Sequence, residues 1–340
     1  MRLLVTGALG YIGSHFSVEA LKKNHELILL DKLEAGAGEI HKTIERLGGA
    51  PCRLIHVDMN DVNQLDKLFK DIAPLDAVIH FAAKKNAFES LSIPVSYYQN
   101  NLACSIHLLT MMQKYQVNKL VFSSTAAVYA DGVMSPIDET MPTLAATPYG
   151  RSKRMVEKVL DDVCTLNQNI SCVSLRYFNA VGAHDSGLLG QVITHEKESN
   201  IMSAILKVAM GRHPALSIYG KDYPTVDGTA VRDYVHVKDL ALGHLKSLDY
   251  LANHQGFSIF NLGCGEGKSI LELVHTFEKQ NGISIPFEYK NRRPGDFGEV
   301  YANVNKAKKL LNWCTEIGLS QAVRDDWHRV QNILKTTDEF

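Results

Sequence analysis

Leu3-Leu4-Val5-Thr6-Gly7-Ala8-Leu9-Gly10-Tyr11-Ile12-Gly13 is the stretch that decides the fold. A short aliphatic run, typical of a buried β-strand, ends in three glycines, and a helical pattern begins among them. Glycines at this junction let the backbone turn sharply and approach a pyrophosphate, whose charge is favoured by the helix N-terminus. The stretch therefore predicts the first strand, turn and helix of a dinucleotide-binding domain.

An acidic residue after the second strand specifies the dinucleotide. The run Leu27 to Asp31 ends in a carboxylate 18 residues after Gly13. A carboxylate at this point binds the two ribose hydroxyls and repels a 2′-phosphate, so the sequence predicts NAD rather than NADP. Asp58 follows the third strand and is expected to meet the adenine, although a solvated strand-end carboxylate is the alternative for this residue alone.

Short apolar runs alternate with longer helical patterns through the first half of the chain. This alternation predicts an α/β protein with a Rossmann-type, doubly wound parallel sheet. The predicted strands are Leu3 to Thr6, Leu27 to Asp31, Leu54 to Val57, Ala77 to Phe81, Lys119 to Ser123 and Cys172 to Tyr177.

The pattern loosens after about residue 180, which predicts a smaller C-terminal α/β domain that binds the substrate. We expect residues 1–180 to form the NAD-binding domain and residues 181–340 to form mainly the second domain, with about 231–265 returning to the first. A helix is predicted near Ser203 to Met210. Ser269 and Glu272 form a capping-box pattern that predicts another helix start.

Composition excludes several classes of function. The chain has 36 basic and 37 acidic residues and no long run of Lys or Arg, so neither nucleic acid nor a membrane surface is an expected partner. The six scattered cysteines favour reduced thiols in a cytoplasmic protein. No apolar stretch reaches the length of a membrane span. The 14 histidines show no paired ligand spacing, so no metal is expected.

A second glycine cluster, Gly263 to Ser269, resembles a phosphate-binding P-loop only in part. The position that needs its first glycine holds Leu262, so the loop is one residue too short. We expect a tight strand-to-helix turn near a ligand instead.

Tyr149 and Lys153 are the predicted catalytic pair. The two residues are four positions apart and therefore lie on one helix face. The lysine ammonium, together with the positive nicotinamide, would lower the pKa of the phenol and let it act as a base. An exposed helix pair is the alternative. The hydroxyl-rich strand end Ser123-Ser124-Thr125 favours catalysis, because one of its hydroxyls could hold the substrate oxygen that the tyrosine deprotonates.

These residues together carry a family resemblance. The glycine loop, Thr125, Tyr149 and Lys153 resemble those of the extended short-chain dehydrogenase/reductases. Within that family, the chain is similar over nearly its whole length to the UDP-glucose 4-epimerases. The most specific matches are Thr6 to His15, Arg176 to Asn179 with Val181 to His184, Asp222 to Thr225, Asp227 to Thr229 and Val231 to Val237.

The resemblance implies a reversible 4-epimerisation of UDP-hexoses through a 4-keto sugar, with NAD tightly bound, Tyr149 as the base, and Lys153 and Thr125 assisting. It implies a cofactor site formed by Gly7, Gly10, Tyr11, Ile12, Gly13, Asp31, Lys32, Asp58, Met59, Phe81, Ala82, Ala83, Lys85, Asn100, Ser123, Ser124, Tyr149, Lys153 and Phe178. It implies a UDP-sugar site formed by Thr125, Tyr149, Asn179, Asn200, Ser217, Ile218, Tyr219, Arg232, Arg293, Asp296 and Val300.

The sequence departs from the family pattern at three places. Thr125 replaces a common serine but keeps the hydroxyl. The stretch Ala82 to Ser90 departs from a smaller, glycine-bearing version, which leaves open whether Lys84 or Lys85 faces the nicotinamide. Val300 stands where many epimerases have a bulky tyrosine, so an N-acetylated sugar is expected to fit, unless Tyr301 is the residue that faces the sugar.

Two other classes of function remain as alternatives. One is a related sugar-nucleotide 4,6-dehydratase, reductase or decarboxylase, although a dehydratase has an Asp-Glu pair where this chain has Ala126-Ala127. The other is a non-catalytic NAD-binding regulator, which would be expected to lose the tyrosine or the lysine. The helical stretches Val95 to Lys114 and Tyr149 to Leu166 carry apolar faces, and the resemblance implies that they build a homodimer through a helix bundle. Intramolecular core is the alternative for both stretches.

Overall fold

A seven-stranded parallel sheet forms the centre of the larger lobe. The structure is a computed structural model that describes residues 1–340 except 33–35, 131, 168, 194–199, 294–296 and 338–340. The strands of the sheet are β1 (Arg2–Thr6), β2 (Glu26–Asp31), β3 (Arg53–His56), β4 (Ala77–His80), β5 (Lys119–Thr125), β6 (Ser171–Tyr177) and β11 (Phe257–Leu262).

The strand order in this sheet is β11-β6-β5-β4-β1-β2-β3, and each neighbouring pair is parallel. The order reverses direction between β1 and β4, and ligands of such sheets bind where the strands end at this point. The predicted α/β class is confirmed, and the six predicted strands lie within two residues of the observed ones.

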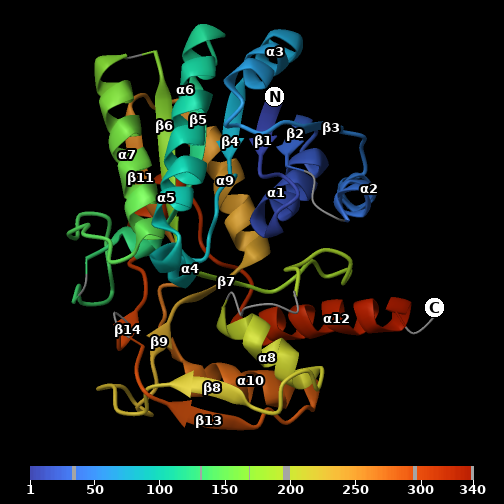
Figure 1. Ribbon diagram of the computed structural model, residues 1–340, viewed down its shortest axis with the longest axis vertical. Coiled ribbons are helices and arrows are strands. Elements are labelled where there is room, and N and C mark those ends of the chain that lie inside the picture. The colour runs from blue at the N-terminus through green and yellow to red at the C-terminus, as the bar shows by residue number, and fades with distance from the viewer. Residues whose placement is uncertain (33–35, 131, 168, 194–199, 294–296, 338–340) are drawn as a thin grey trace.

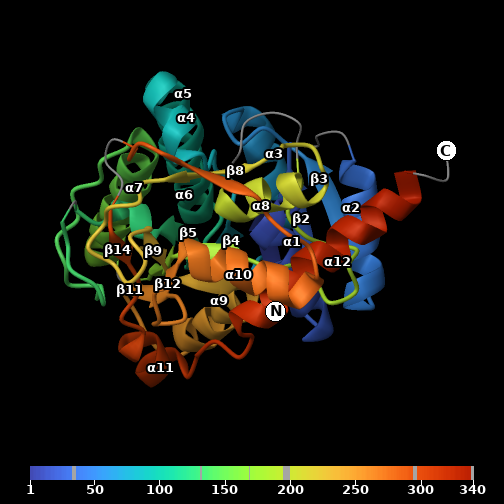
Figure 2. The same ribbon diagram turned by 90° about the horizontal axis from the view of Figure 1, so that it is seen from below.

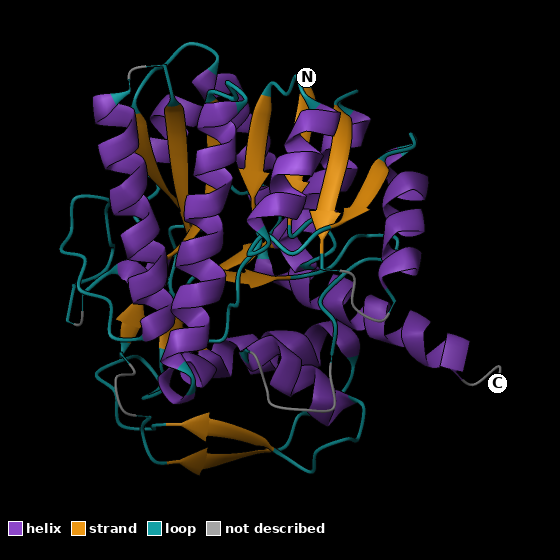
Figure 3. Cartoon of the chain, turned by 45° about the horizontal axis from the view of Figure 1, so that its top comes forward, coloured by secondary structure: helices purple, strands orange, loops and turns teal. Residues whose placement is uncertain are grey.

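Helices cover both faces of the sheet (Figure 3). In chain order the helical segments are α1 (Tyr11–Lys22), α2 (Ala37–Gly48), α3 (Val62–Ile72), α4 (Ala87–Ser92), α5 (Pro94–Tyr97), the π-helical turn η1 (Tyr98–Ala103), α6 (Cys104–Lys114), the 3₁₀ turn η2 (Ala126–Val128), α7 (Pro148–Leu166), α8 (Ile201–Ala209), α9 (Val237–Leu251), α10 (Ile270–Asn281), α11 (Asn305–Leu311) and α12 (Leu319–Thr337).

Alternating side chains of the buried strands feed two separate cores. Leu3 and Val5 pack in one core with Phe16 of α1 and Leu240 of α9. Leu4 points the opposite way, into a core that contains residues of α3, α6 and α7. Because both faces are covered, the strands are apolar at successive positions instead of alternating with polar residues.

The second lobe lies beyond the carboxyl ends of these strands (Figure 1). It contains two parallel pairs of strands and a small mixed sheet. Its helices α8, α10 and α12 share a core around Ile205, Phe277 and Val323. Figure 2 shows α10 and α12 side by side when the molecule is seen from below. The remaining strands are β7 (Asn179–Val181), β8 (Leu216–Tyr219), β9 (Val231–Arg232), β10 (Tyr234–His236), β12 (Lys268–Ser269), β13 (Phe287–Lys290) and β14 (Glu299–Val300).

The chain passes between the two lobes more than once. After β6 it forms β7, which pairs in parallel with β10. From β10 it runs directly into α9, which packs against α1, and then into β11, which pairs with β6. The predicted capping box at α10 is confirmed, because Ser269 and Glu272 each accept a hydrogen bond from the other's backbone N–H.

No helix in the described part of the chain combines the length and the apolar character that crossing a bilayer requires.

Candidate cofactor and substrate site

The glycine loop connects β1 to α1 and lies tightly against its neighbours. Gly7 has a positive φ of 67°, and a Cβ there would lie 2.6 Å from the Ala82 backbone nitrogen. A Cβ at Gly13 would lie 2.3 Å from the Gly7 carbonyl oxygen, so both positions require glycine. Among the described residues, no side chain caps α1 at Gly10. The first N–H groups of the helix are therefore oriented to receive an anion.

Asp31 fixes the loop and ends β2. One carboxylate oxygen accepts a hydrogen bond of 2.8 Å from the Leu9 N–H, and the other accepts one of 2.8 Å from the Lys32 N–H. The Lys32 ammonium lies 3.1 Å from Asp58, which precedes the buried Met59. Each Asp31 oxygen keeps a second lone pair, so the carboxylate can still accept hydrogen bonds from ribose hydroxyls.

Tyr149 and Lys153 occupy the first two turns of α7, next to the end of β5. The Lys153 ammonium is buried and donates a hydrogen bond of 2.7 Å to the Ser123 carbonyl oxygen. Burial lowers the pKa of Lys153 to about 8, while Cys104 and Glu157 act in the opposite direction. Burial raises the pKa of Tyr149, and a hydrogen bond with Thr125 opposes that shift. The phenol thus lies beside one hydroxyl, with the ammonium one helical turn away.

Two features bring α7 close to the strand end. Thr147 caps the helix by accepting a hydrogen bond from the Gly150 N–H. A Cβ at Gly150 would lie 2.2 Å from the Ala127 carbonyl oxygen, so only glycine allows this approach. The residue next to the tyrosine therefore determines how close the phenol comes to Thr125.

Glu157 holds the catalytic helix to the sheet. It is fully buried and accepts hydrogen bonds from Ser124 (2.7 Å) and Ser174 (3.0 Å). It also pairs with the buried Arg176 guanidinium at 2.8 Å. Of the three strand-end hydroxyls, that of Ser124 therefore bonds the Glu157–Arg176 ion pair, whereas that of Thr125 lies beside Tyr149. The sequence pattern did not predict a role for Glu157, although this residue lies four positions after Lys153.

The side chains of Lys84 and Lys85, the two lysines between which the sequence could not decide, point to different neighbours. The Lys85 ammonium lies over the Tyr11 ring of the glycine loop, 5.8 Å from its centroid. The Lys84 ammonium donates a hydrogen bond of 2.7 Å to Ser96 and lies over Tyr97. Lys85 is thus the one directed toward the glycine loop.

The loop between β4 and α4 lies between the glycine loop and α7, on one side of the candidate site. Phe81, Ala82 and Ala83 are half-buried where this loop begins, and Asn100 lies in η1. π-Helical turns of this kind often occur at functional sites. Asn101, the next residue, bonds the Lys84 backbone and the Ser152 hydroxyl, so it joins the loop to α7. Nothing in the sequence pattern singled out Asn101.

Apart from Thr125 and Tyr149, the expected substrate residues come from five separate segments. Asn179 is half-buried in β7, and its N–H donates to the Asp233 carbonyl oxygen. Asn200 caps α8. In β8, Ser217 and Tyr219 are half-buried, whereas the side chain of Ile218 is in the core, so a substrate contact at that residue is left to its backbone. Asp296 lies outside the described residues.

The two arginines are held differently. Arg232 in β9 donates to the carbonyl oxygens of Val231 (2.8 Å) and Phe297 (3.0 Å). The guanidinium of Arg293 lies 3.6 Å from the centroid of the Tyr219 ring.

Val300 and Tyr301 have opposite orientations. Val300 packs against the cluster of Phe178, Tyr129 and Val128, next to the end of β5. The Tyr301 ring lies against Gly267, where a Cβ would meet it at 3.0 Å. Val300 is therefore on the side of Phe178 and the catalytic strand end.

The second glycine cluster surrounds an acid instead of a phosphate. The N–H groups of Cys264 and Gly265 donate to the buried Asp233 carboxylate at 2.6 and 3.0 Å. The loop leads from β11 to α10, as a strand-to-helix turn was expected to do.

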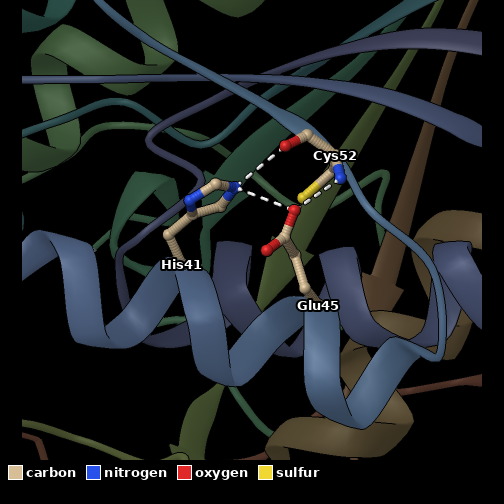
Figure 4. Close-up of side chains that lie close together, drawn as sticks. All are labelled: His41, Glu45 and Cys52. Carbon is tan, nitrogen blue, oxygen red and sulfur yellow. Dashed lines mark hydrogen bonds and ion pairs between the residues drawn. The ribbon is translucent and has the colours of Figure 1, made fainter.

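A possible metal-ligand group lies outside the site, between α2 and the start of β3 (Figure 4). The ligand atoms of His41, Glu45 and Cys52 lie within 4.8 Å of one another. His41 Nε2 is 2.9 Å from the Cys52 carbonyl oxygen, and Glu45 accepts 2.9 Å from the Cys52 N–H. These polar atoms already bond one another, so the group has a structural role without an ion.

Comparison with known proteins finds relatives that match nearly the whole chain. A UDP-glucose 4-epimerase of Bacillus subtilis is 42% identical over 327 residues, which are 96% of each chain. A crystal structure of UDP-glucose-4-epimerase from Stenotrophomonas maltophila with bound NAD and formylated UDP-arabinopyranose has a TM-score of 0.95 at 40% identity and covers 99% of each chain. The Bifidobacterium longum enzyme, in complex with NAD+ and UDP, has a TM-score of 0.91 at 38% identity over 98% of each chain.

A family model matches residues 3–263, which run from β1 through the glycine loop, the end of β5 and the Tyr149 and Lys153 pair to the end of β11. Since this match covers most of the chain and the relatives match it nearly end to end, the chain belongs to the NAD dependent epimerase/dehydratase family.

Proposed function

We propose that this protein interconverts UDP-hexoses, UDP-glucose and UDP-galactose among them, by reversible epimerisation at C4. The observation that carries the proposal is the position of Tyr149, beside Thr125 and one helical turn from the buried Lys153 ammonium. The relatives reported above are UDP-glucose 4-epimerases, and the protein is an NAD-dependent isomerase of that kind.

The residues of the first lobe fit NAD. The crowded Gly7 and Gly13 bring backbone N–H groups to a surface where a pyrophosphate can approach, and Asp31 stands at the end of β2 for ribose hydroxyls. When bound, NAD supplies the acceptor for the C4 hydride and gives the hydride back.

The protein's own residues handle the proton. Tyr149 accepts the proton of the sugar 4-hydroxyl and later returns it to the 4-keto oxygen, while Thr125 holds that oxygen by a hydrogen bond. The Lys153 ammonium lowers the free energy of the phenolate by its charge, and the Ser123 carbonyl fixes the ammonium in place. Inversion would require the two faces of C4 to be presented in turn to the bound nicotinamide while the C4 oxygen stays within reach of Tyr149, so the anchor of the substrate has to lie away from C4.

The nucleotide diphosphate provides that anchor. Arg232 and Arg293 are the proposed partners of the diphosphate, because guanidinium groups bind phosphate oxygens in bidentate fashion. Asn179 and Asn200 are proposed to hold the rest of the substrate. Elimination chemistry is disfavoured, because the positions after Thr125 in η2 are Ala126 and Ala127, which have no acid or base.

N-acetylated UDP-hexoses are proposed as further substrates. Val300 packs on the side of Phe178, and a valine there leaves room that a tyrosine would fill. Val300→Tyr is expected to abolish turnover of UDP-N-acetylgalactosamine while UDP-galactose is still converted. Equal turnover of both sugars by the variant would contradict this part of the proposal.

We propose a cytoplasmic homodimer. The described cysteines are all free, which suits a reducing compartment. Val95, Ile106 and Met155 leave 67%, 42% and 44% of their surfaces exposed on α5, α6 and α7. α5 and α6 are joined through η1, and α7 packs against both α5 and η1. An exposed apolar face on adjacent helices supports self-association.

The direct test uses the purified protein without added reductant. UDP-galactose and UDP-N-acetylgalactosamine are supplied separately, the sugar products are followed by NMR, and bound NAD is measured after denaturation. We expect inversion at C4 with NAD retained, and a loss of at least about a thousandfold in Tyr149→Phe, in the range of a lost general base together with its hydrogen bond. Inversion at an unchanged rate in Tyr149→Phe would contradict the mechanism.

A further inference from the structure

The Arg293 guanidinium lies between two aromatic rings that come from different lobes. Its centre is 3.6 Å from the centroid of Tyr219 and 4.8 Å from the centroid of Phe88. Tyr219 ends β8 in the second lobe, and Phe88 lies in the first turn of α4, at the end of the first lobe that faces the second (Figure 1). One side chain thus contacts an aromatic ring from each lobe.

Phe88 is unusual because its ring is mostly outside the core. It is 51% exposed, and neither of the two cores of the first lobe includes it. An exposed phenylalanine contributes little to folding, so its contact with Arg293 is the feature that gives it a role. Phe88 also lies within the stretch Ala82 to Ser90, where the sequence departs from the smaller family version.

The contacts of Arg293 with Tyr219 and Phe88 suit anion binding. Rings over the two faces of a guanidinium attract its charge and leave the N–H groups at its perimeter free to point outward. A side chain already held in one plane loses less conformational freedom when a ligand binds. Arg232, by contrast, is held by the carbonyl oxygens of Val231 and Phe297.

We propose that Phe88 is a positioning residue for the nucleotide diphosphate: with Tyr219 it holds the Arg293 guanidinium so that its N–H edge meets the phosphate oxygens. This rests on the proposed function, in which Arg293 binds the diphosphate. Phe88 itself does not touch the reacting carbon. Its effect is therefore on binding, and it depends on the phosphates of the ligand.

The test measures binding to the NAD-loaded protein by calorimetry, with UDP and uridine as probes. Phe88→Leu keeps the bulk of the side chain but removes the ring face, and it is expected to weaken UDP binding about three- to fivefold. Uridine, which has no phosphates, is expected to bind equally to both proteins. Phe88→Tyr keeps the ring and is expected to restore UDP affinity. Leu91→Ala, at a 56% exposed position of the same helix, is the matched control and should leave UDP affinity unchanged.

A double-mutant cycle with Arg293→Ala separates this inference from the proposal beneath it. Arg293→Ala alone is expected to weaken UDP binding, and Phe88→Leu should then cause no further loss. KM for UDP-galactose should rise in Phe88→Leu while kcat stays constant. The inference is overturned if Phe88→Leu binds UDP normally, weakens uridine equally, or has its full effect without Arg293. Failure of the proposed function would appear instead as absent C4 inversion in the unmodified protein.

Discussion

Lys153 is buried and donates its hydrogen bond to the Ser123 backbone carbonyl, which makes its charge sensitive to pH. Burial lowers its pKa to about 8. Above that pH the ammonium loses its proton, and the Tyr149 phenol loses the charge that makes it easier to ionise. We expect kcat/KM to fall on the alkaline side with a midpoint near pH 8.

Lys153→Arg checks the origin of this limb. A guanidinium stays protonated throughout the range, so the alkaline limb should move beyond about pH 10 even if the overall rate is lower. Rates are compared between pH 6 and 10, with bound NAD measured at each point as the control. An unchanged limb in the variant would assign the ionisation to another group.

Asp326 is a second buried ionisable residue, and it supports the glycine loop from α12. It accepts a hydrogen bond of 2.8 Å from the Gly182 N–H, and the Gly182 carbonyl accepts one from the Tyr11 hydroxyl. Burial, together with the neighbouring Asp325, raises its pKa to about 7. The folded protein therefore holds a proton between about pH 4 and 7 that the unfolded chain releases, so this group's contribution to stability declines from about pH 4 to about pH 7 and is constant above that.

Asp326→Asn is expected to remove this dependence, because an amide oxygen still accepts from Gly182 but carries no charge. The urea midpoint of the variant, relative to the unmodified protein, should increase from pH 5 to about pH 7 and then level off. Asp162→Asn, on the exposed surface of α7, is the control and should follow the unmodified curve. A constant difference across the range would show that Asp326 does not titrate there.

Residue types and spacing were enough to single out Tyr149 and Lys153, whose catalytic role stays a proposal. Tyr149, Lys153 and Thr125 could be found because a helix brings positions four apart onto one face and a hydroxyl follows the strand. Glu157, Asn101 and Asp326 could not, since their roles depend on partners 17 to 144 residues away. Such long-range pairs leave no periodic signal in a single sequence.

At the scale of elements, α7 is fixed to β5 and β6 by a buried ion pair. Glu157 and Arg176 are 0% and 2% exposed at their side chains. Removal of one partner leaves a buried charge uncompensated and costs about 3–5 kcal/mol. Glu157→Met is therefore expected to lower the unfolding midpoint markedly and to reduce kcat, because α7 carries Tyr149.

The double variant Glu157→Met with Arg176→Met is the matched comparison. It removes both charges together, so it should be more stable than Glu157→Met alone in the same denaturation experiment. A double variant that is less stable than both single variants would mean that packing, and not the unpaired charge, dominates the loss.

The long strands of the first lobe were predictable, and the short ones of the second were not. Strands such as β5 are buried on both faces and give continuous apolar runs. By contrast, β9, β12 and β14 have two residues each, and their pairing is set by the loops around Asp233. β11 was also missed as a strand, because only one of its first four residues is fully buried.

At the scale of the whole molecule, the exposed apolar face of α5, α6 and α7 determines the expected assembly. Ile106→Asp places a charge on the exposed surface of α6 and is expected to convert the proposed dimer to a monomer. Sedimentation velocity at several protein concentrations measures the change. Leu310→Asp is the control, because this leucine on α11 is 43% exposed against 42% for Ile106. A dimer that persists in Ile106→Asp, or dissociates in both variants, would place the interface elsewhere.

The pairing of β11 with β6 has a consequence for how this protein can be dissected. Every residue of β6 is buried, yet the strand on its outer side, β11, is formed by residues that come about eighty positions later in the sequence. A gene fragment that ends at residue 180 would leave β6 as a bare edge with unpaired amides and apolar flanks, and such edges recruit other chains. We expect that fragment to be recovered only as aggregate, whereas an intact chain nicked in the loop before α8 should remain folded.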